Sequence, residues 1–310
     1  MRGNVLILIN DIVNVHPATD CSLFIADCLA ENFDVEIGLS DSLSFVNNKY
    51  VVLKCTFSCS LLCNKTLSLE LFSWENVDEK KYLKVFFRAD IPQDIFYIQS
   101  LQLLHLVGSG RNKTINPINV LLSTNSKLLL LDIPPNFRPL SIVSGNSAQI
   151  IKWFDQYHPV IIKPLNSCLS KDVRIMHNIS DLQLYLSTHV AQTYILEVLI
   201  ADFWKRELRI WFINYEFMFA VQKHYDENCV LNYSNSFFIE KCTLTTKEKE
   251  VILFLQTFLK QKRIALAGVD IIQGLVTDIN IESPGLLREA SLLLGKKKMV
   301  KRSLIKLVLE

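Results

Sequence analysis

Two apolar runs near the end of the chain restrict the fold more than any other feature of the sequence. They cover residues 266–272 and 276–281 and flank the short segment Gln273-Gly274-Leu275. Apolar runs of this length around a loop that contains glycine predict a β-hairpin. Because side chains alternate between the two faces of a strand, the hairpin also predicts which polar residues share a face.

Pairing across that loop brings acidic side chains together. With a three-residue loop, Ile272 pairs with Val276. Asp270 then lies directly opposite Asp278, and Asn280 shares their face two residues further along. Two opposed carboxylates repel each other, and a bound cation would remove that repulsion. Their hard oxygen ligands suit Mg²⁺, which would carry nucleotide phosphates. Two solvated acids beside a turn are the alternative that spacing alone leaves open.

The composition is that of a globular protein with a large core. The chain has 310 residues, half of them hydrophobic, and a net charge of +2. At roughly 150 residues per domain, this length indicates two domains or one elaborate domain. The balance of 33 basic and 31 acidic residues argues against nucleic acid as the main partner.

The sequence favours a cytoplasmic protein without a membrane partner. No apolar run reaches the roughly 18 residues that a transmembrane helix needs, and the apolar start is shorter than that of a signal peptide. Among the eight cysteines, Cys55, Cys59 and Cys63 have a spacing unlike that of a zinc site. Free thiols are therefore expected, as in most cytoplasmic proteins.

The first part of the chain predicts a parallel sheet. A strand at 5–9, a helix at 18–32 and a strand at 34–37 form a β-α-β opening. The elements expected next are a hairpin at 43–57 that turns at Asn47-Asn48, a strand at 83–87 and a helix at 94–107. The polar segment 108–116 then places a domain boundary near residue 120.

Beyond residue 120 the pattern of elements changes. Asn146 or Ser147 is expected to cap one helix, and Thr245 or Thr246 a second, longer one. Strands are expected at 141–144, 160–163, 194–199 and 208–213. The lysine-rich run at 296–302 precedes a short amphipathic end, which we interpret as a solvated helix rather than a membrane anchor.

Several short motifs, in a consistent order, resemble those of the bacterial glutathione synthetases, members of the ATP-grasp superfamily. The segment GVDIIQGLVTDINIESPG resembles that family's G-[IL]-D-[IV]-I-G and L-T-E-I-N-V-T-S-P patterns, with matches at Asp270, Asp278, Asn280, Ser283 and Pro284. Further similarities are FRADIPQD with R-K-D-P-P-F-D, NPINVLLSTNSKL with N-K-P-x-x-L-R-x-x-N-E-K-L, VIIKPL with I-L-K-P-L, and Glu207-Leu208-Arg209 with D-K-R.

The resemblance implies an α/β (α+β) chain, in which a Rossmann-like pre-ATP-grasp domain precedes an ATP-grasp domain. The N-terminal, glutathione-synthetase-like substrate domain would cover residues 1–120. The ATP-grasp nucleotide-binding domain would cover 121–310, with a central lid part at about 121–195 and a C-terminal part at about 196–310. A homo-oligomer is implied as well, because bacterial relatives are often oligomers.

The resemblance also implies roles for individual residues. Lys127 and Lys163 would reach the α- and β-phosphates of ATP, and Glu207 would accept a ribose hydroxyl. Arg209 would be catalytic, because it would stabilise the transferring phosphate or the substrate carboxylate. The other implied sites are an adenine hinge at Glu197, Val198, Leu199 and Ile200, Mg²⁺ (possibly Mn²⁺) ligands at Asp270, Asp278 and Asn280, and substrate-binding residues at Arg88, Asn232 and Ser283.

The residues by themselves leave a structural alternative open for each role. Arg209 could instead form an ion pair with Glu207 or Glu282, and Arg88 could tie the end of a strand to Asp90. The lysines could lie on the surface beside strands, and the hinge could be a plain edge strand.

In this family ATP phosphorylates the C-terminal carboxylate of γ-glutamylcysteine, and the amine of glycine then displaces phosphate. The implied partners are therefore small molecules, with no nucleic acid and no membrane. The chain departs from the family at 166–170, where a glycine-rich D-G-M-G-G is missing, and after Lys223, where Asn232 survives from R-G-N-L-x-x-G-G but Ser236-Phe237 replaces its glycines. His224 and Tyr225 are expected in that second loop.

These departures leave three hypotheses. The first is a divergent glutathione synthetase, and the second is an ATP-grasp ligase for another acid and amine. The third is a non-catalytic relative that binds nucleotide weakly or serves as a scaffold.

Overall fold

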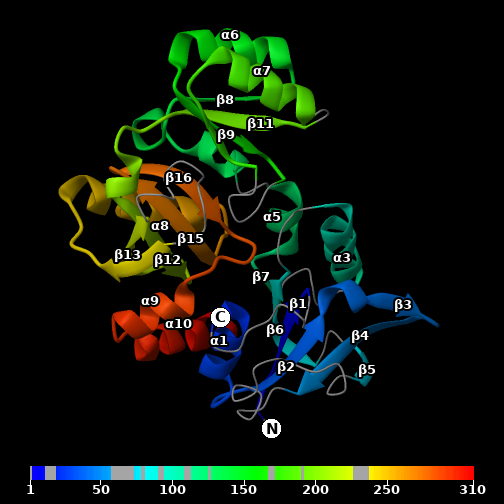
Figure 1. The fold of residues 1–310 in the computed structure, drawn as a ribbon. Coiled ribbons are helices and arrows are strands. Elements are labelled where there is room, and N and C mark those ends of the chain that lie inside the picture. Colours follow the sequence, from blue (N-terminus) through cyan, green and yellow to red (C-terminus); the bar gives the residue numbers. More distant parts are fainter. Residues whose placement is uncertain are drawn as a thin grey trace.

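Three β-sheets with helices packed on them make up the computed structural model (Figure 1). The structure describes residues 2–10, 19–56, 73–77, 81–89, 94–107, 113–124, 127–166, 172–189, 192–225 and 237–310. The N-terminal, middle and C-terminal sheets lie within residues 4–115, 141–198 and 207–280. The expected α/β class is confirmed, whereas the domain boundaries near residues 120 and 195 stay predictions.

The N-terminal sheet begins with the predicted β-α-β unit. Its parallel strands are β1 (Asn4–Ile9), β2 (Asp34–Leu39), β6 (Tyr82–Arg88) and β7 (Thr114–Ile115). β3 (Ser44–Val46), β4 (Lys49–Thr56) and β5 (Ser73–Asn76) extend one edge in antiparallel pairs. The predicted turn between β3 and β4 is confirmed, since Asn47 and Asn48 have φ angles of 49° and 62°. Asparagine tolerates this left-handed backbone.

Helices cover both faces of this sheet. α1 (Cys21–Leu29) lies on one face, and its Asp20 cap accepts a hydrogen bond from the Leu23 amide at 2.7 Å. α1 is shorter than the predicted helix at 18–32, because Asp20 has extended backbone and the chain leaves the helix at Ala30. α3 (Ile95–Leu106) and α5 (Ile118–Ser123) belong to the other side, where Leu101 and Leu104 join the apolar core.

The middle sheet is antiparallel, in the order β10-β9-β11-β8. Its strands are β8 (Ser141–Ser144), β9 (Val160–Pro164), β10 (Arg174–Met176) and β11 (Tyr194–Val198). α6 (Ser147–Tyr157), capped by Asn146 as predicted, and α7 (Ile179–Thr188) lie together over one face (Figure 1). The contact of Ile150 and Phe154 with strand residues forms a small separate core, so this part packs as a unit.

The C-terminal sheet is also antiparallel, in the order β14-β13-β12-β15-β16. Its strands are β12 (Glu207–Ile213), β13 (Glu216–Tyr225), β14 (Phe237–Lys241), β15 (Leu266–Ile272) and β16 (Leu275–Asn280). α8 (Thr246–Gln261) packs on one face through Val251, Leu255 and Leu259. A capping box of Thr245 and Glu248 starts that helix, so its predicted cap is confirmed.

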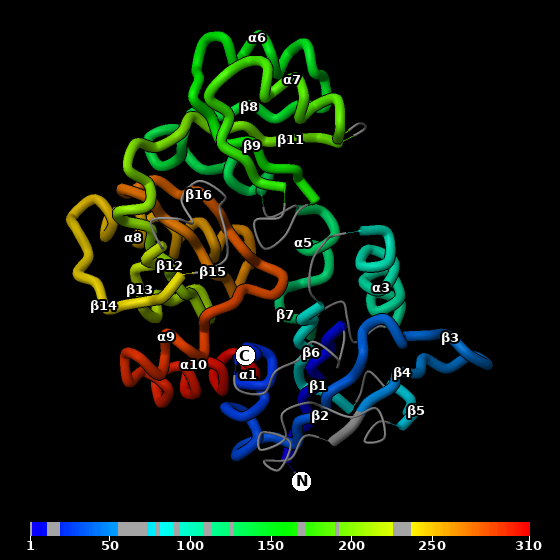
Figure 2. Tube along the Cα trace, in the orientation of Figure 1, coloured from blue at the N-terminus to red at the C-terminus, as the bar shows by residue number. Residues whose placement is uncertain are grey.

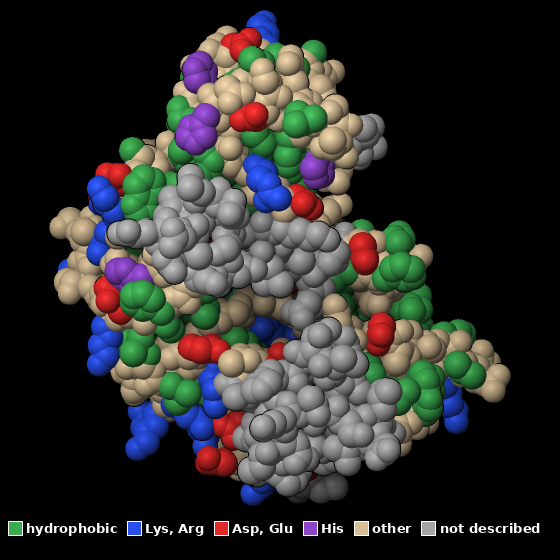
Figure 3. Space-filling view, in the orientation of Figure 1, with side chains coloured by type: hydrophobic (Ala, Val, Ile, Leu, Met, Phe, Trp, Pro, Cys, Tyr) green, Lys and Arg blue, Asp and Glu red, His purple; other side chains and the backbone are tan. Residues whose placement is uncertain are grey.

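The last two helices return the chain to the N-terminal part. α9 (Leu287–Leu293) and α10 (Lys297–Leu309) lie beside α1, where the C-terminus also ends (Figure 2). Lys297 forms an ion pair with Asp27 at 2.7 Å, and Lys301 pairs with Glu31. Basic and acidic side chains gather on this region of the surface (Figure 3). Within the described residues, no helix is both long and apolar enough to cross a membrane.

A buried asparagine ties the N-terminal part to the C-terminal sheet. The Asn116 side chain accepts a hydrogen bond from the Leu266 amide at 2.9 Å. It also donates to the Leu266 and Ile281 carbonyl oxygens, both at 2.8 Å. Asn116 therefore fixes the start of β15 and the residue after β16 against the segment that follows β7.

Replacing this side chain should lower the stability of the protein measurably. Asn116→Ala removes three hydrogen bonds and leaves buried backbone groups unpaired, so the free energy of unfolding should fall by about 2–4 kcal/mol. Chemical denaturation measures the loss. Asn119→Ala, which truncates an exposed asparagine of α5, is the matched control and should change stability by less than about 0.5 kcal/mol. Equal stability of the two variants would contradict this role of the Asn116 side chain.

Candidate active site

The hairpin of β15 and β16 has the predicted acidic pair but a different turn. Asp270 is opposite Asp278, as predicted. The predicted pairing of Ile272 with Val276 was wrong, because Ile272 pairs with Leu275 across a two-residue turn. Both turn residues have positive φ, 51° for Gln273 and 75° for Gly274. A register shift after Asp270 leaves one extra residue on β16, and this bulge restores the opposition of the two acids.

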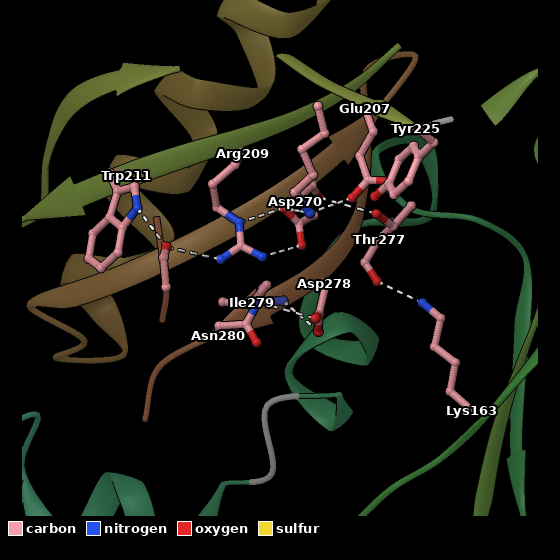
Figure 4. Close-up of polar contacts among 12 residues, drawn as sticks. Lys163, Glu207, Arg209, Trp211, Tyr225, Asp270, Thr277, Asp278, Ile279 and Asn280 are labelled. Carbon is pink, nitrogen blue, oxygen red and sulfur yellow. Dashed lines mark hydrogen bonds and ion pairs between the residues drawn. The ribbon is translucent and has the colours of Figure 1, made fainter. Parts of the chain in front are cut away.

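Asp270 is buried between two basic side chains (Figure 4). Its carboxylate accepts hydrogen bonds from Arg209 Nε at 2.7 Å and Arg209 Nη2 at 2.8 Å. Lys223 Nζ lies 3.0 Å from the same carboxylate. Burial raises the pKa of Asp270, but the charges of Arg209 and Lys223 outweigh it and lower the pKa below its ordinary value. Asp270 is therefore a charged, fully paired carboxylate.

Glu207 shares Lys223 with Asp270. Lys223 Nζ donates to Glu207 Oε1 at 2.6 Å, and the Tyr225 hydroxyl donates to Glu207 Oε2 at 2.6 Å. Glu207 and Lys223 are cross-strand partners on β12 and β13, so the sheet register places them together. A ribose hydroxyl, the implied partner of Glu207, would have to share this carboxylate with two protein donors.

Asp278 differs from the other acids of this face. Its two oxygens accept hydrogen bonds from the Ile279 amide and from Asn280 Nδ2, both at 3.1 Å. Within the described residues, it forms no ion pair within 4.0 Å. Its negative charge is therefore balanced less directly than that of Asp270.

Lys163 reaches this face from the middle sheet (Figure 4). Its Nζ pairs with Glu197 Oε2 at 2.6 Å and donates to the Thr277 carbonyl oxygen at 2.9 Å. Burial lowers the pKa of Lys163, but Glu197 and Asp278 outweigh it and raise the pKa above its ordinary value. The ammonium thus joins β9 and β11 to β16, at the border between two sheets.

The hinge that follows Glu197 is only partly open to a ligand. The Val198 amide donates to the Leu140 carbonyl oxygen at 2.9 Å, and the Leu199 amide donates to the Pro159 carbonyl oxygen at 3.0 Å. These bonds fix the chain as it leaves β11.

The other residues with implied roles lie around the edge of this face. Arg88 is buried and donates to Ser22 Oγ at 3.3 Å. It also donates to the Glu282 and Pro284 carbonyl oxygens, both at 3.2 Å, and Ser283 Oγ donates to the Ala89 carbonyl oxygen at 3.0 Å. Lys127 Nζ donates to the Leu165 carbonyl oxygen at 3.3 Å. Asn232, Asp90, Cys59, Cys63 and residues 167–170 lie outside the described residues.

Comparison with known proteins identifies this arrangement. The family described as Prokaryotic glutathione synthetase, ATP-grasp domain, matches residues 126–294, which is more than half of the chain. The chain belongs to the prokaryotic glutathione synthetase family. It is accordingly an ATP-grasp ligase, an enzyme that forms C–N bonds, and the resemblance read from the motifs is confirmed.

Individual relatives agree with this family at low identity. A glutathione synthetase of Synechococcus elongatus is 25% identical over 227 residues, which cover 69% of this chain and 68% of the relative. A glutathione synthetase of Neisseria meningitidis serogroup A is 28% identical over 215 residues, 66% of each chain.

Solved structures share the fold of this glutathione synthetase relative along its whole length. The macrocyclase MdnC of Microcystis aeruginosa, solved with a precursor peptide, has a TM-score of 0.65 at 13% identity and covers 99% of this chain and 100% of its own. The D-cycloserine synthetase DcsG has a TM-score of 0.65 at 14% identity, with 97% of this chain and 99% of its own covered. At such identities the likeness concerns the fold alone.

The donor set of this ATP-grasp ligase fits a hard divalent cation at one end of the acidic face. Asp278 and Asn280 offer carboxylate and amide oxygens, the ligands that Mg²⁺ prefers. Asp270 already accepts three hydrogen bonds, and an ionised carboxylate has roughly four acceptor positions. In the described part of the chain, no three His, Cys, Asp or Glu side chains are grouped as a metal site. Asp278 and Asn280 are therefore the better candidates.

Three features of the site escaped the sequence analysis. Arg209 pairs with Asp270 rather than with Glu207 or Glu282, which were the alternatives considered. His224 and Tyr225 belong to β13, not to a loop as expected, because β13 continues in register with β14. Lys223 was not assigned a role, although its place two residues before Tyr225 on an alternating strand was a usable signal.

The pairing of Asp270 predicts how stability depends on pH. A carboxylate whose pKa is lowered in the folded state stabilises the fold at pH values above its ordinary pKa, near 3.8. This stabilisation is lost as the pH falls below that value. The difference in unfolding free energy between the wild type and Asp270→Asn should therefore be constant near neutral pH and shrink below about pH 4. Denaturation at a series of pH values measures it. Asp155→Asn, at an exposed position of α6, is the control whose difference should stay flat. If the difference in unfolding free energy between the wild type and Asp270→Asn did not change with pH, the ion pair would be contradicted.

Proposed function

We propose that this ligase activates the C-terminal carboxylate of γ-glutamylcysteine with ATP and joins it to glycine. The observation that carries the proposal is the cluster of Asp278, Asn280 and Lys163 at the border of two sheets, in a chain of the glutathione synthetase family. An oxygen-rich end for a divalent cation and a basic group for phosphate lie side by side there.

The basic side chains suit a nucleotide triphosphate. Lys163 is held by Glu197 and the Thr277 carbonyl oxygen, so an incoming phosphate would find an ammonium already positioned. Lys127, whose Nζ donates to the Leu165 carbonyl oxygen, would add a second cation. A divalent cation bound by Asp278 and Asn280 would supply further neutralisation of phosphate charge.

The hinge supports a role in holding a base. The amides of Val198 and Leu199 already donate to protein carbonyl oxygens. Ile200, the next residue, lies outside any strand and is half-buried. Its amide is the hinge donor that we assign to a ring nitrogen of adenine, since flat bases are commonly bound by backbone groups at such a border.

The chemistry proceeds in two balanced steps. A carboxylate oxygen of the acid attacks the γ-phosphorus of ATP, the bond to the bridging oxygen breaks, and ADP leaves. The glycine amine then attacks the acyl carbon, the bond to the phosphate oxygen breaks, and phosphate leaves while the amine loses a proton to solvent. Such transfers are accelerated mainly by positioning the reactants and neutralising their negative charge. Arg209, held by Asp270, would stabilise charge on the transferring group.

A second candidate is a ligase for a different acid and amine. Arg88 is the residue that would bind the acidic peptide. Three of its N–H groups already donate hydrogen bonds to Ser22 and to the backbone of Glu282 and Pro284. The glycine-rich segment that the family carries at 166–170 is also replaced by larger side chains. The contacts of Arg88 favour an altered acid site, whereas the replaced segment corresponds to the family's lid over the phosphates and bears on the nucleotide site.

Product analysis tests the proposal directly. Incubation with ATP, Mg²⁺, γ-glutamylcysteine and glycine should release phosphate and yield glutathione by mass spectrometry. Asp278→Asn should lower turnover by more than about 100-fold, because one carboxylate ligand is lost. Phosphate release that requires another acid or amine would favour the second candidate. The absence of any nucleotide-dependent rise in melting temperature would contradict both.

A lysine comparison tests the phosphate site by itself. Lys163→Met should weaken ATP binding by about 10- to 100-fold, since a charged hydrogen bond contributes about 1.5–3 kcal/mol. Isothermal titration with a non-hydrolysable ATP analogue gives the affinity without turnover. Lys152→Met, at an exposed position of α6, is the matched control and should bind as the wild type does. Unchanged affinity in Lys163→Met would remove this residue from the phosphate site.

A further inference from the structure

Lys223 lies where a cation would be needed between two buried acids. It is on β13, and its side chain is almost completely buried. Its ammonium contacts Glu207 Oε1 at 2.6 Å and Asp270 Oδ1 at 3.0 Å. Glu207 is its cross-strand partner, and Asp270 lies on the strand beyond β12. The bridge therefore follows from the sheet register and not from a chance approach of a long side chain.

The negative charges of this face are not equally neutralised by basic side chains along its length. Glu207 and Asp270 carry two negative charges, and Lys223 and Arg209 carry two positive charges in direct contact with them. Lys163 and Glu197 form a further balanced pair. Asp278 keeps a charge that, among the described residues, has no ion-pair partner within 4.0 Å. The end of the face at β16 is therefore the acidic end.

Asp270 and Asp278 also differ in how many of their acceptor positions are used by protein donors. Asp270 Oδ1 accepts from Arg209 and Lys223, and Asp270 Oδ2 accepts from Arg209. Among the described residues, Asp278 accepts two hydrogen bonds, both from uncharged donors at 3.1 Å. Because Asn280 donates through its Nδ2, its side-chain oxygen remains a possible ligand. A divalent cation at Asp270 would face two fixed positive groups, whereas Asp278 and Asn280 offer oxygen ligands from one face of β16.

We propose that the Lys223 ammonium serves as a built-in cation between Asp270 and Glu207, so that this ligase loads its nucleotide with a single divalent cation, held at Asp278 and Asn280. Asp270 is then a positioning residue that holds Arg209 and Lys223, not a metal ligand. The proposal rests on the proposed nucleotide-binding function and specifies how that site is built in this chain.

Counting Mn²⁺ tests the proposal. The full-length protein is titrated with Mn²⁺ in the presence of saturating β,γ-imido ATP, and free Mn²⁺ is followed by electron paramagnetic resonance. The wild type should bind one Mn²⁺ per chain. Lys223→Met should bind a second, because Asp270 and Glu207 then lack their shared cation. Lys223→Arg, which keeps the charge, and Lys241→Met, at an exposed position of neighbouring β14, should each bind one.

Two acidic variants give an independent readout. Asp278→Asn should weaken Mn²⁺ binding by more than about 100-fold, and Asp270→Asn by less than about tenfold, as expected of a ligand and of a neighbour. Two Mn²⁺ in the wild type, or equal losses in the two acidic variants, would overturn the inference even if Lys223→Met failed to fold.

The outcomes separate this inference from the proposed function. Binding of the nucleotide analogue is measured in the same samples by calorimetry. Nucleotide binding with two Mn²⁺ per wild-type chain leaves the ligase function standing and overturns the role of Lys223. No nucleotide binding at any Mn²⁺ concentration overturns both.

Discussion

The ion pair between Arg209 and Asp270 is the contact on which the C-terminal sheet depends. Asp270 is buried and Arg209 nearly so, and each charge taken from water costs several kcal/mol unless it is paired and hydrogen-bonded. The two-point contact between the guanidinium and the carboxylate provides that compensation only when β12 and β15 are in one register. Lys223 then extends the same requirement to β13. The charged face thus adds to the register that the apolar face, packed on α8, already specifies.

Space for this pair comes from a glycine. At Gly268 a Cβ atom would come within 2.8 Å of Pro284 Cβ and 3.3 Å of Arg209 Nη1. Trp211 and Arg209 both donate to the Gly285 carbonyl oxygen, at 3.2 Å and 3.4 Å, so the segment after β16 folds back over the same side of the sheet. Arg88 reaches this segment from the N-terminal sheet through two carbonyl oxygens. The segment that follows the acidic hairpin is therefore held by side chains from both parts of the chain.

Sequence reasoning succeeded where local rules act and failed where distant strands meet. The caps at Asn146 and Thr245 and the turn at Asn47-Asn48 follow from side chains that bond their own backbone. The opposition of Asp270 and Asp278 was right although the turn was wrong, because a shorter loop and a bulge changed the pairing by compensating amounts. The partner of Arg209 was missed, since it lies 61 residues away in sequence and is chosen by strand order. Motif order identified the family, which no single contact could have done.

Most of the groups that we assign to nucleotide and cation lie on strands of two sheets. These strands are β9, β12 and β16. β9 and β12 each have a hydrogen-bonded strand on both sides, whereas β16 is at the edge of its sheet. The positions at which the sequence departs from the family, 166–170 and those after Lys223, lie between strands in the order of the chain. Solved structures at 13% and 14% identity keep the whole fold, although one is a macrocyclase and another a D-cycloserine synthetase. A change at Glu207 or Asp270 of this chain would require buried charges to be paired again.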